Sequence, residues 1–236
     1  MNLQYVLLLL ILAGAMLASV AAKKLTIAAA LTGGSLGLLI YAGAGFTGIA
    51  LVAVFFLLGT LATSWKKRYK ESAGLSERNS SRRNVGQVLA NAGVAAICGL
   101  FAYFFQQYVV VCRLLMAASL SSAMADTLSS ELGNVYGKRF YNILTLQKDT
   151  RGLNGVVSLE GTSIGIAGSM IIALVYAVGF GFSWSTFLII LIAGTIGNLF
   201  DSVLGASLER KEYLNNDAVN FLNTMIGALA ALILYV

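Results

Sequence analysis

Long apolar runs separated by short polar segments dominate the chain. Eight of these runs are close to the twenty or so residues that a helix needs to cross a hydrocarbon core of roughly 30 Å. We expect transmembrane helices at Leu3 to Ala22, Leu25 to Tyr41, Gly45 to Thr63, Val85 to Gln106, Val109 to Ala125, Gly161 to Val178, Trp184 to Phe200 and Ala218 to Val236. The pattern predicts an all-α, polytopic integral membrane bundle in which residues 1–236 form a single domain.

The first apolar run resembles a secretory signal peptide in length. However, no basic segment precedes it, because Lys23 and Lys24 follow the run instead. No clear small-residue cleavage site stands before these lysines. We therefore expect this run to be a retained helix.

The composition supports a membrane protein and restricts its chemistry. Hydrophobic residues make up 58% of the chain and charged residues 11%, whereas about a quarter of a soluble protein is charged. The chain has no histidine, which excludes His-dependent triads and typical zinc sites. It also has no proline, so any irregular backbone inside the membrane falls to its 25 glycines. The two cysteines, Cys98 and Cys112, lie in apolar runs and do not indicate a disulfide framework.

Charged residues follow every second span. All of the 16 Lys and Arg residues except Arg113, and all ten Asp and Glu residues, follow the first, third, fifth and seventh spans. The positive-inside rule places these segments in the cytoplasm and both termini outside the cytoplasmic membrane. Arg113 lies a few residues inside the fifth span at its outer end, and we expect its side chain to extend to the outer interface.

The longest basic segment lies between the third and fourth spans. Its charged residues are Lys66, Lys67, Arg68, Lys70, Glu71, Glu77, Arg78, Arg82 and Arg83. They could anchor the chain to anionic lipid headgroups, worth about 1 kcal/mol per basic residue, or clamp a phosphate group. Asn84, Gln87 and Asn91 share one helix face at the start of the fourth span, which favours a water-filled cleft there.

The second charged segment combines carboxylates with a glycine-rich turn. Asp126 and Glu131 bracket two serines where the fifth span leaves the hydrocarbon, a costly place for an unpaired carboxylate. Residues 148–162 read KDTRGLNGVVSLEGT and lead into the sixth span. Glycines beside Lys148 and Arg151, ahead of a helix N-terminus, predict a phosphate cradle.

The third charged segment repeats this outline. Asp201 and a following serine end the seventh span, and NNDAVN at 215–220 opens the eighth. An Asn or Asp here can serve simply as the helix N-cap. Asn216, Asn220 and Asn223, however, recur at i, i+4 and i+7, so polar side chains enter the membrane on one face. The match of Asp-Thr-Leu at 126 with Asp-Ser-Val at 201 also hints at a repeat of helical hairpins.

These residue types fit a hard divalent cation together with phosphate groups. Magnesium prefers oxygen ligands and is usually shared between one or two carboxylates and substrate phosphates. Phosphoryl transfer needs metal and cationic side chains to neutralise charge, with little covalent chemistry from the protein. A soluble phosphate donor would approach from the cytoplasm, while a lipid acceptor would present its headgroup at the level of Asp126 and Asp201.

Several blocks of the sequence resemble one membrane family over nearly the whole chain. They are FLLGTLATSWKKRYK at 56–70, RRNVGQVLAN at 82–91, ADTLSSELG at 125–133, RGLNGVVSLEGT at 151–162, DSVLGA at 201–206 and NDAVN at 216–220. The family is the one labelled domain of unknown function 92, which includes animal transmembrane protein 19 and the plant phytyl-phosphate kinase. More distantly, the order of Asp126, Lys148, SLEG and a late Asn-Asp pair is similar to dolichol and phytol kinases and CDP-lipid synthases.

The resemblance implies a CTP-preferring kinase that converts an isoprenyl monophosphate, such as a phytyl, geranylgeranyl or polyprenyl phosphate, to its diphosphate. The predicted catalytic residues are Asp126, Glu131 and Asp201, and these with Asp217 are predicted to hold one or two Mg²⁺ ions. The predicted nucleotide- and lipid-binding residues are Lys148, Arg151, Gly152, Asn154, Gly155, Ser158, Asp217, Asn220, Lys66, Lys67, Arg82, Arg83, Asn84 and Asn91. No Walker A or protein-kinase motif is present.

Other functions stay open from the sequence. A nucleotidyltransferase that makes a CDP-lipid would need the same metal and CTP site. A transporter or flippase of a lipid phosphate or anionic solute would need polar groups reachable from both sides, whereas here they cluster at one interface. The expected partners are the bilayer, a nucleoside triphosphate and an isoprenyl phosphate, without nucleic acid; a homo-oligomer is compatible with the sequence.

Overall fold

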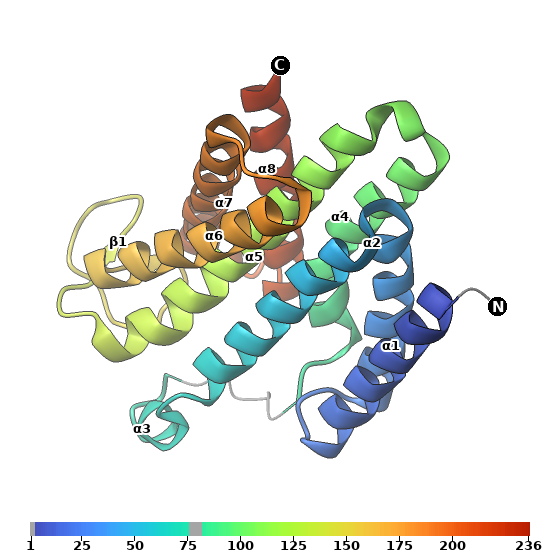
Figure 1. The fold of residues 1–236 in the computed structure, drawn as a ribbon. Helices are drawn as coiled ribbons and strands as arrows, with labels where there is room; N and C mark the ends of the chain where they lie inside the picture. Colours follow the sequence, from blue (N-terminus) through green and yellow to red (C-terminus); the bar gives the residue numbers. More distant parts are fainter. Residues whose placement is uncertain (1–2, 76–81) are drawn as a thin grey trace.

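The computed structural model of the chain, which describes residues 3–75 and 82–236, is a helical bundle (Figure 1). Its helices are α1 (Leu3–Ala21), α2 (Ile27–Ser64), α3 (Lys67–Ser72), α4 (Val85–Phe104), α5 (Val109–Tyr136), α6 (Leu159–Phe180), α7 (Trp184–Leu204) and α8 (Asn216–Tyr235). Within those described ranges, seven helices are long and apolar enough to cross a membrane. The prediction of an all-α, polytopic membrane bundle is confirmed.

Helix α2 accounts for two of the predicted spans because it folds back on itself. Gly45 has φ 60° and ψ −151°, a conformation outside the helical region that essentially only glycine adopts. A Cβ atom built on Gly37 would lie 3.9 Å from Cδ1 of Ile49, although twelve residues of straight helix would separate them by about 18 Å. The two arms, at 27–44 and 46–64, therefore correspond to the second and third predicted spans. A glycine, in a chain without proline, makes the turn.

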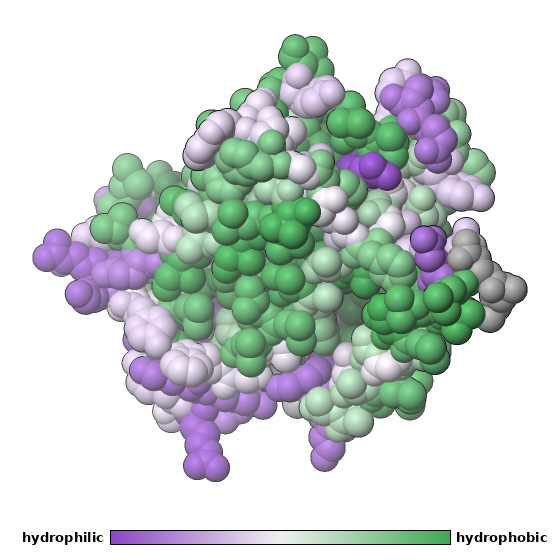
Figure 2. Space-filling model, viewed as in Figure 1, coloured by the Kyte–Doolittle hydropathy of each residue, from purple (hydrophilic) through white to green (hydrophobic). Residues whose placement is uncertain are grey.

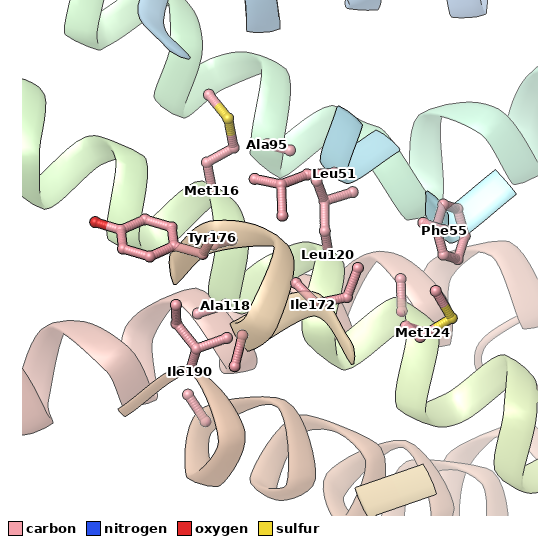
Figure 3. Close-up of a cluster of buried hydrophobic side chains, with 14 of the residues drawn as sticks. Leu51, Phe55, Ala95, Met116, Ala118, Leu120, Met124, Ile172, Tyr176 and Ile190 are labelled. Atoms are coloured by element: carbon pink, nitrogen blue, oxygen red, sulfur yellow. The ribbon is translucent and has the colours of Figure 1, made fainter. Parts of the chain in front are cut away.

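Helix α5 forms the centre of the bundle. Its neighbours are α2, α4, α8, α7 and α6, which surround it in that order, while α1 packs outside against α2. The core lies around α5 and contains Met116, Leu120 and Met124 from this helix, with Leu51 of α2 and Ile172 of α6 against them (Figure 3). Five of the other helices are thus positioned directly on α5.

Small residues allow the backbones around α5 to approach closely. A Cβ on Gly133 of α5 would lie 2.8 Å from the Cα atom of Gly161 in α6. A Cβ on Gly197 of α7 would collide with the Ser122 hydroxyl of α5 at 1.8 Å. Because the helices share the membrane with equally apolar lipid, close van der Waals packing of this kind is a main source of helix association.

The polar ends of the helices differ from the expected spans. Helix α5 continues to Tyr136, well past the predicted boundary at Ala125, and α7 runs into a π-helical turn, η2 (Gly205–Glu209). A short antiparallel strand pair, β1 (Tyr141–Asn142) and β2 (Val156–Val157), and the 3₁₀ turn η1 (Gln106–Tyr108) were not predicted either. The strands and the two short turns escape a search based on apolar length because none of them approaches the length of a membrane span.

The surface separates into an apolar belt and polar edges. Figure 2 shows hydrophobic residues across the middle of the visible face and hydrophilic residues gathered mainly along its lower and left edges. The described segments that carry charge, around 24, 64–75, 82–84, 126–160 and 201–217, meet at one end of the bundle, which we call the charged end. Which side of the membrane this end faces stays a prediction.

Arg113 contacts the turn that joins the two arms of α2, and its extension to the outer interface stays a prediction. Its Nε atom donates a 3.0 Å hydrogen bond to the carbonyl of Gly43, and its guanidinium lies 4.9 Å from the ring centre of Phe180. The turn at Gly45 ends the first arm of α2 and leaves carbonyl groups without helical partners. Arg113 satisfies one of them, so its role in the fold is structural.

Candidate active site

A pocket of about 990 Å³ opens at the charged end of the bundle. Side chains from α2, α3, α4, α5, α6, α7 and α8, from η2 and from the loop before α6 line it. Residues 76–81, with Glu77 and Arg78, lie outside the described residues. Each charged segment identified in the sequence contributes described residues to this one polar pocket.

The most distinctive feature of the polar pocket is a pair of carboxyl groups. Asp126 of α5 and Asp201 of α7 both line it, and their side chains are hydrogen-bonded to each other. The amide of Asn223 in α8 donates to Asp201 at 3.3 Å. Two carboxyl groups in hydrogen-bond contact must share either a proton or a cation, since like charges repel each other.

A network of amide and hydroxyl side chains lies beside this pair, toward the buried interior of the bundle. Asn223 accepts a hydrogen bond from the buried hydroxyl of Ser122. The Ser129 hydroxyl of α5 donates at 3.0 Å to Asn198 of α7, three residues before Asp201. Asn198 and Ser129 were not among the predicted site residues, although the spacing of Asn198 from Asp201 places both on one face of α7. Asn223 was recognised only as part of the polar face of the eighth span.

The donor atoms around the pair suit magnesium. Two carboxylates with amide and hydroxyl oxygens nearby are hard ligands, and Mg²⁺ commonly takes one or two carboxylates and completes its shell with water and phosphate oxygens. Across residues 3–75 and 82–236, no three Asp, Glu or Cys side chains gather around one point. The structure thus brings together two of the four predicted metal ligands, Asp126 and Asp201, and leaves Glu131 and Asp217 apart from them.

Glu131 has a different partner. It forms an ion pair with Lys70 of α3, whose ammonium also donates to the carbonyls of Ala62 at 3.1 Å and Thr63 at 2.9 Å. Only 3% of the Lys70 side chain is exposed. The ammonium satisfies two carbonyls at the C-terminal end of α2, where the helix dipole favours a cation. Nothing in the spacing of the seven basic residues of this segment had distinguished Lys70.

Other cations face the polar pocket. Lys24, Arg82 and Arg83 line it from the segments before α2 and α4, and Lys67 lines it from the first position of α3. Arg83 is held in place: its backbone pairs with Lys24, and its guanidinium lies 5.7 Å from the ring centre of Phe55. Gly59 allows this approach, because a Cβ there would lie 3.0 Å from the Arg83 guanidinium.

Three helix N-termini point toward the same volume. Asn84 caps α4, Ser158 caps α6 and Asn215 caps α8, each by accepting a hydrogen bond from a backbone N–H one turn on. The first turns of these helices contribute Gln87, Ser158, Gly161 and Asn216 to the pocket lining. Helix N-termini carry partial positive charge and favour anions, so their convergence adds to the cationic side chains.

The glycine-rich loop lies against η2 at the edge of the polar pocket. Gly155 has φ 71°, and a Cβ there would lie 2.4 Å from Ala206. Arg210 fixes the loop by donating to the Asn154 carbonyl at 2.6 Å and to Asp149 at 2.8 Å. The Thr150 backbone N–H, followed by the Arg210 guanidinium, holds the pKa of Asp149 below its ordinary value.

Twelve of the predicted site residues line the polar pocket: Lys67, Arg82, Arg83, Asn91, Asp126, Glu131, Gly152, Asn154, Gly155, Ser158, Asp201 and Asn220. Five others lie outside its lining: Lys66, Asn84, Lys148, Arg151 and Asp217. The Arg151 guanidinium lies between the rings of Tyr69 and Phe140, at 5.4 and 5.8 Å, and the Lys66 ammonium lies over Tyr136. The Asp217 carboxylate packs against Gly86 in the first turn of α4.

The sequence comparison identifies the family. Residues 9–228 match the family described as integral membrane protein DUF92. The chain belongs to the DUF92 family. This result confirms the resemblance found in the sequence, and the matched range includes every residue that lines the polar pocket.

Relatives in this DUF92 family come from bacteria, archaea and plants. The chain is 36% identical to the uncharacterized membrane protein sll0875 of Synechocystis over 84% of its length and 77% of that protein. It is 33% identical to protein VTE6, chloroplastic, of Arabidopsis thaliana over 84% of its length and 62% of that protein. The uncharacterized membrane protein MJ0933 of Methanocaldococcus jannaschii is 31% identical over 81% of the chain and 77% of that protein. No solved structure matches the chain.

Proposed function

We propose that this protein is a lipid-phosphate kinase that transfers the terminal phosphoryl group of a nucleoside triphosphate, CTP by preference, to an isoprenyl monophosphate. The products are the isoprenyl diphosphate and the nucleoside diphosphate. The similarity to protein VTE6 and the family resemblance to the plant phytyl-phosphate kinase support this class of reaction.

The observation that carries the proposal is the composition of the polar pocket. Its lining joins the Asp126–Asp201 pair to the cations Lys24, Lys67 and Arg82 and to three helix N-termini. Positive groups on this scale fit several phosphates, while the carboxyl pair fits a divalent cation bound between them. The volume of about 990 Å³ is at the upper end of the range for small-molecule sites, as a nucleotide and a lipid headgroup would require.

The chemistry needs little from the protein beyond binding and charge stabilisation. An oxygen of the lipid phosphate attacks the γ-phosphorus, a new P–O bond forms, and the bond to the β,γ-bridging oxygen breaks as the nucleoside diphosphate leaves. A phosphate monoester with a second pKa of about 6 is largely deprotonated at pH 7, so the acceptor requires no general base. A chain without histidine is consistent with such an acceptor.

The residues of the polar pocket divide the remaining tasks. Asp126 and Asp201 would hold magnesium, which neutralises charge on the donor phosphates when bound. Asn223 and Asn198 orient the helices that carry the two carboxylates, through the contacts to Asp201 and Ser129. Lys67, Arg82 and the N-termini of α6 and α8 lie where they would position phosphate oxygens for in-line attack.

The test is a product assay on the purified full-length protein. We expect γ-labelled CTP, Mg²⁺ and geranylgeranyl or phytyl monophosphate to give labelled lipid diphosphate and unlabelled CDP. Replacement of Mg²⁺ by excess chelator should abolish the transfer. No labelled diphosphate with any isoprenyl monophosphate or nucleoside triphosphate would refute the proposal.

A nucleotidyltransferase is the second candidate, because the same carboxyl pair and cations fit it. In that reaction an oxygen of the lipid phosphate attacks the α-phosphorus of CTP, the bond to the α,β-bridging oxygen breaks, and pyrophosphate leaves as CMP is joined to the lipid phosphate. The γ-label then appears in pyrophosphate, whereas an α-label appears in the lipid product. One assay with both labels therefore distinguishes the two reactions.

A further inference from the structure

A second hollow, the apolar groove, lies on the membrane-facing side of the bundle. Its walls include Leu58 and Leu61 of α2, Trp65 directly after this helix, Leu128 and Leu132 of α5, and Ile171 of α6. Its volume is about 270 Å³. From Trp65 to Leu58 it extends about 10 Å along α2, at 1.5 Å of rise per residue.

The apolar groove marks the place where the ring of helices around α5 is least complete. Around the ring, α2 packs closely on α4, α4 on α8, α8 on α7 and α7 on α6, whereas α6 and α2 meet less extensively. Leu128 and Leu132 of the central helix border the hollow through this seam. The seam is therefore the side on which α5 is least covered by the surrounding helices.

The apolar groove ends beside the polar pocket. Ala62 lines the groove, and its carbonyl accepts a hydrogen bond from Lys70, which lines the pocket. Glu131, the partner of Lys70, follows Leu128 by three residues and precedes Leu132 by one on α5. The partly buried Lys70–Glu131 ion pair thus stands between the two volumes.

Trp65 and Tyr136 mark the interfacial end of the apolar groove. The Trp65 indole donates a 2.8 Å hydrogen bond to the Tyr136 hydroxyl, and the Lys66 ammonium lies 5.2 Å from the Tyr136 ring centre. Such aromatic residues with a flanking cation are typical of the headgroup level of a bilayer. A chain in the groove would therefore descend into the hydrocarbon while its headgroup stayed level with the polar pocket.

We propose that the apolar groove holds the first part of the isoprenyl chain of the lipid substrate and that the phosphate reaches the polar pocket past the Lys70–Glu131 pair. This assignment rests on the proposed function for the identity of the lipid. It makes the α2–α6 seam the substrate entrance, and it makes Ile171 and Leu132 determinants of affinity for the lipid chain.

Trp65 provides a binding assay that needs no catalysis. The chain has two tryptophans, and Trp184 lies at the start of α7, outside the apolar groove. In a Trp184→Phe variant, geranylgeranyl monophosphate added to the protein in lipid nanodiscs should change the Trp65 fluorescence saturably. The Trp65→Phe variant, whose fluorescence comes from Trp184, should show no saturable change with this lipid. Inorganic phosphate should cause no saturable change in the Trp184→Phe variant.

A matched pair of substitutions on α6 tests the apolar groove as a chain site. Ile171→Phe adds bulk inside the groove, whereas Val178→Phe adds the same ring at a position that is 89% exposed on the same helix. Ile171→Phe should raise the KM for geranylgeranyl monophosphate by about tenfold, the cost of about 1.4 kcal/mol. The KM for the nucleotide should stay unchanged, and Val178→Phe should alter neither value.

The outcomes separate this inference from the proposed function. Saturable Trp65 binding that Ile171→Phe weakens supports the apolar groove even if no phosphoryl transfer is found. Kinase activity with unchanged lipid KM in Ile171→Phe, or with no Trp65 response, overturns the groove and leaves the function standing. An equal Trp65 response to a diacyl phosphatidic acid also overturns it, because the groove would then accept membrane lipids in general.

Discussion

Arg113, toward the uncharged end of the bundle, and Arg82, at the charged end, are used by the fold in different ways. The Arg113 guanidinium is half-buried, donates to the Gly43 carbonyl and lies over the Phe180 ring. Arg82 is exposed and lines a pocket that it shares with Lys67, Asp126 and Asp201. One cation completes the packing of three helices, whereas the other faces a volume large enough for a ligand.

The contrast between Arg113 and Arg82 shows how to interpret a charged residue in this membrane bundle. A charge placed in or near hydrocarbon is costly, and it persists where the protein satisfies it or where function requires it. Lys70 and Arg113 belong to the first kind, because each satisfies backbone carbonyls at an end of one arm of α2. Under the proposed function, the Asp126–Asp201 pair belongs to the second kind, since two adjacent acids repel each other unless they share a proton or a cation.

The strongest test of this contrast is neutralisation of the carboxyl pair. Asp126→Asn and Asp201→Asn should each lower kcat by about 10²–10³-fold, because loss of a metal ligand removes several kcal/mol of charge stabilisation. The half-saturating Mg²⁺ concentration should rise in both variants. The stability of the protein should hold or increase, because the acid–acid repulsion is relieved.

Glu212→Gln is the control for this test, since Glu212 is an exposed acid outside the polar pocket. It should keep the parent kcat and Mg²⁺ dependence. Full activity in both asparagine variants would show that the pair is structural and would remove the distinction between the two ends.

The Lys70–Glu131 ion pair should respond mainly in stability. Glu131→Gln leaves the buried Lys70 ammonium without a counter-charge, at a cost of about 3 kcal/mol in the free energy of unfolding. Thermal unfolding in detergent measures the change. The double variant Lys70→Met with Glu131→Gln should recover more than half of that loss, because no unpaired buried charge remains. Equal stability of the single and double variants would show that the pair contributes no coupling energy.

The sequence predicted the fold well because apolar length is a direct requirement of the bilayer. The eight runs, the all-α class and the clustering of the charged segments all follow from it. The sequence predicted irregular backbone at glycines, but it did not predict that Gly45 makes a turn. Its position depends on two apolar arms packing on each other, which a hydropathy pattern does not contain.

The site was predicted in composition more than in geometry. Asp126 and Asp201 meet because α5 and α7 pack against each other in the tertiary structure. This contact is consistent with the matching positions of the two residues at the ends of two predicted spans. The spacing of Glu131 from Asp126 suggested that both belong to one site. However, Glu131 lies five residues after Asp126 on the helix, so its side chain points in another direction, toward Lys70 of α3. Arg151 was grouped with the phosphate cradle on charge, yet its guanidinium lies against Tyr69 and Phe140. Pairings of this kind join segments far apart in the chain.

A smaller effect, on stability alone, is expected for substitutions of Arg113 at the uncharged end. Arg113→Leu removes a hydrogen bond to the Gly43 carbonyl and a cation–π contact, so it should lower the free energy of unfolding by about 1–2 kcal/mol. The kcat of the folded fraction should equal that of the parent. Arg113→Lys should retain part of the stability because the ammonium keeps its charge near Phe180. A kcat loss beyond the unfolded fraction would mean that the uncharged end takes part in the reaction.

The smallest expected effect concerns how Asp149 anchors the glycine-rich loop at the charged end. The pKa of Asp149 is lowered in the folded protein by the Thr150 N–H and by Arg210, so the ionised form stabilises the fold. This contribution is complete above the ordinary carboxyl pKa of 3.8 and is lost as the pH falls through the lower folded value. Amide exchange of Asn154 and Gly155, corrected for intrinsic rates, should therefore rise at acidic pH. Asp149→Asn should show the faster exchange already at pH 7 and lose the acid-dependent step. If the acid-dependent step persists in Asp149→Asn, another carboxyl group anchors the loop. The contact between Asp149 and Arg210 is then not needed to hold the loop at the polar pocket.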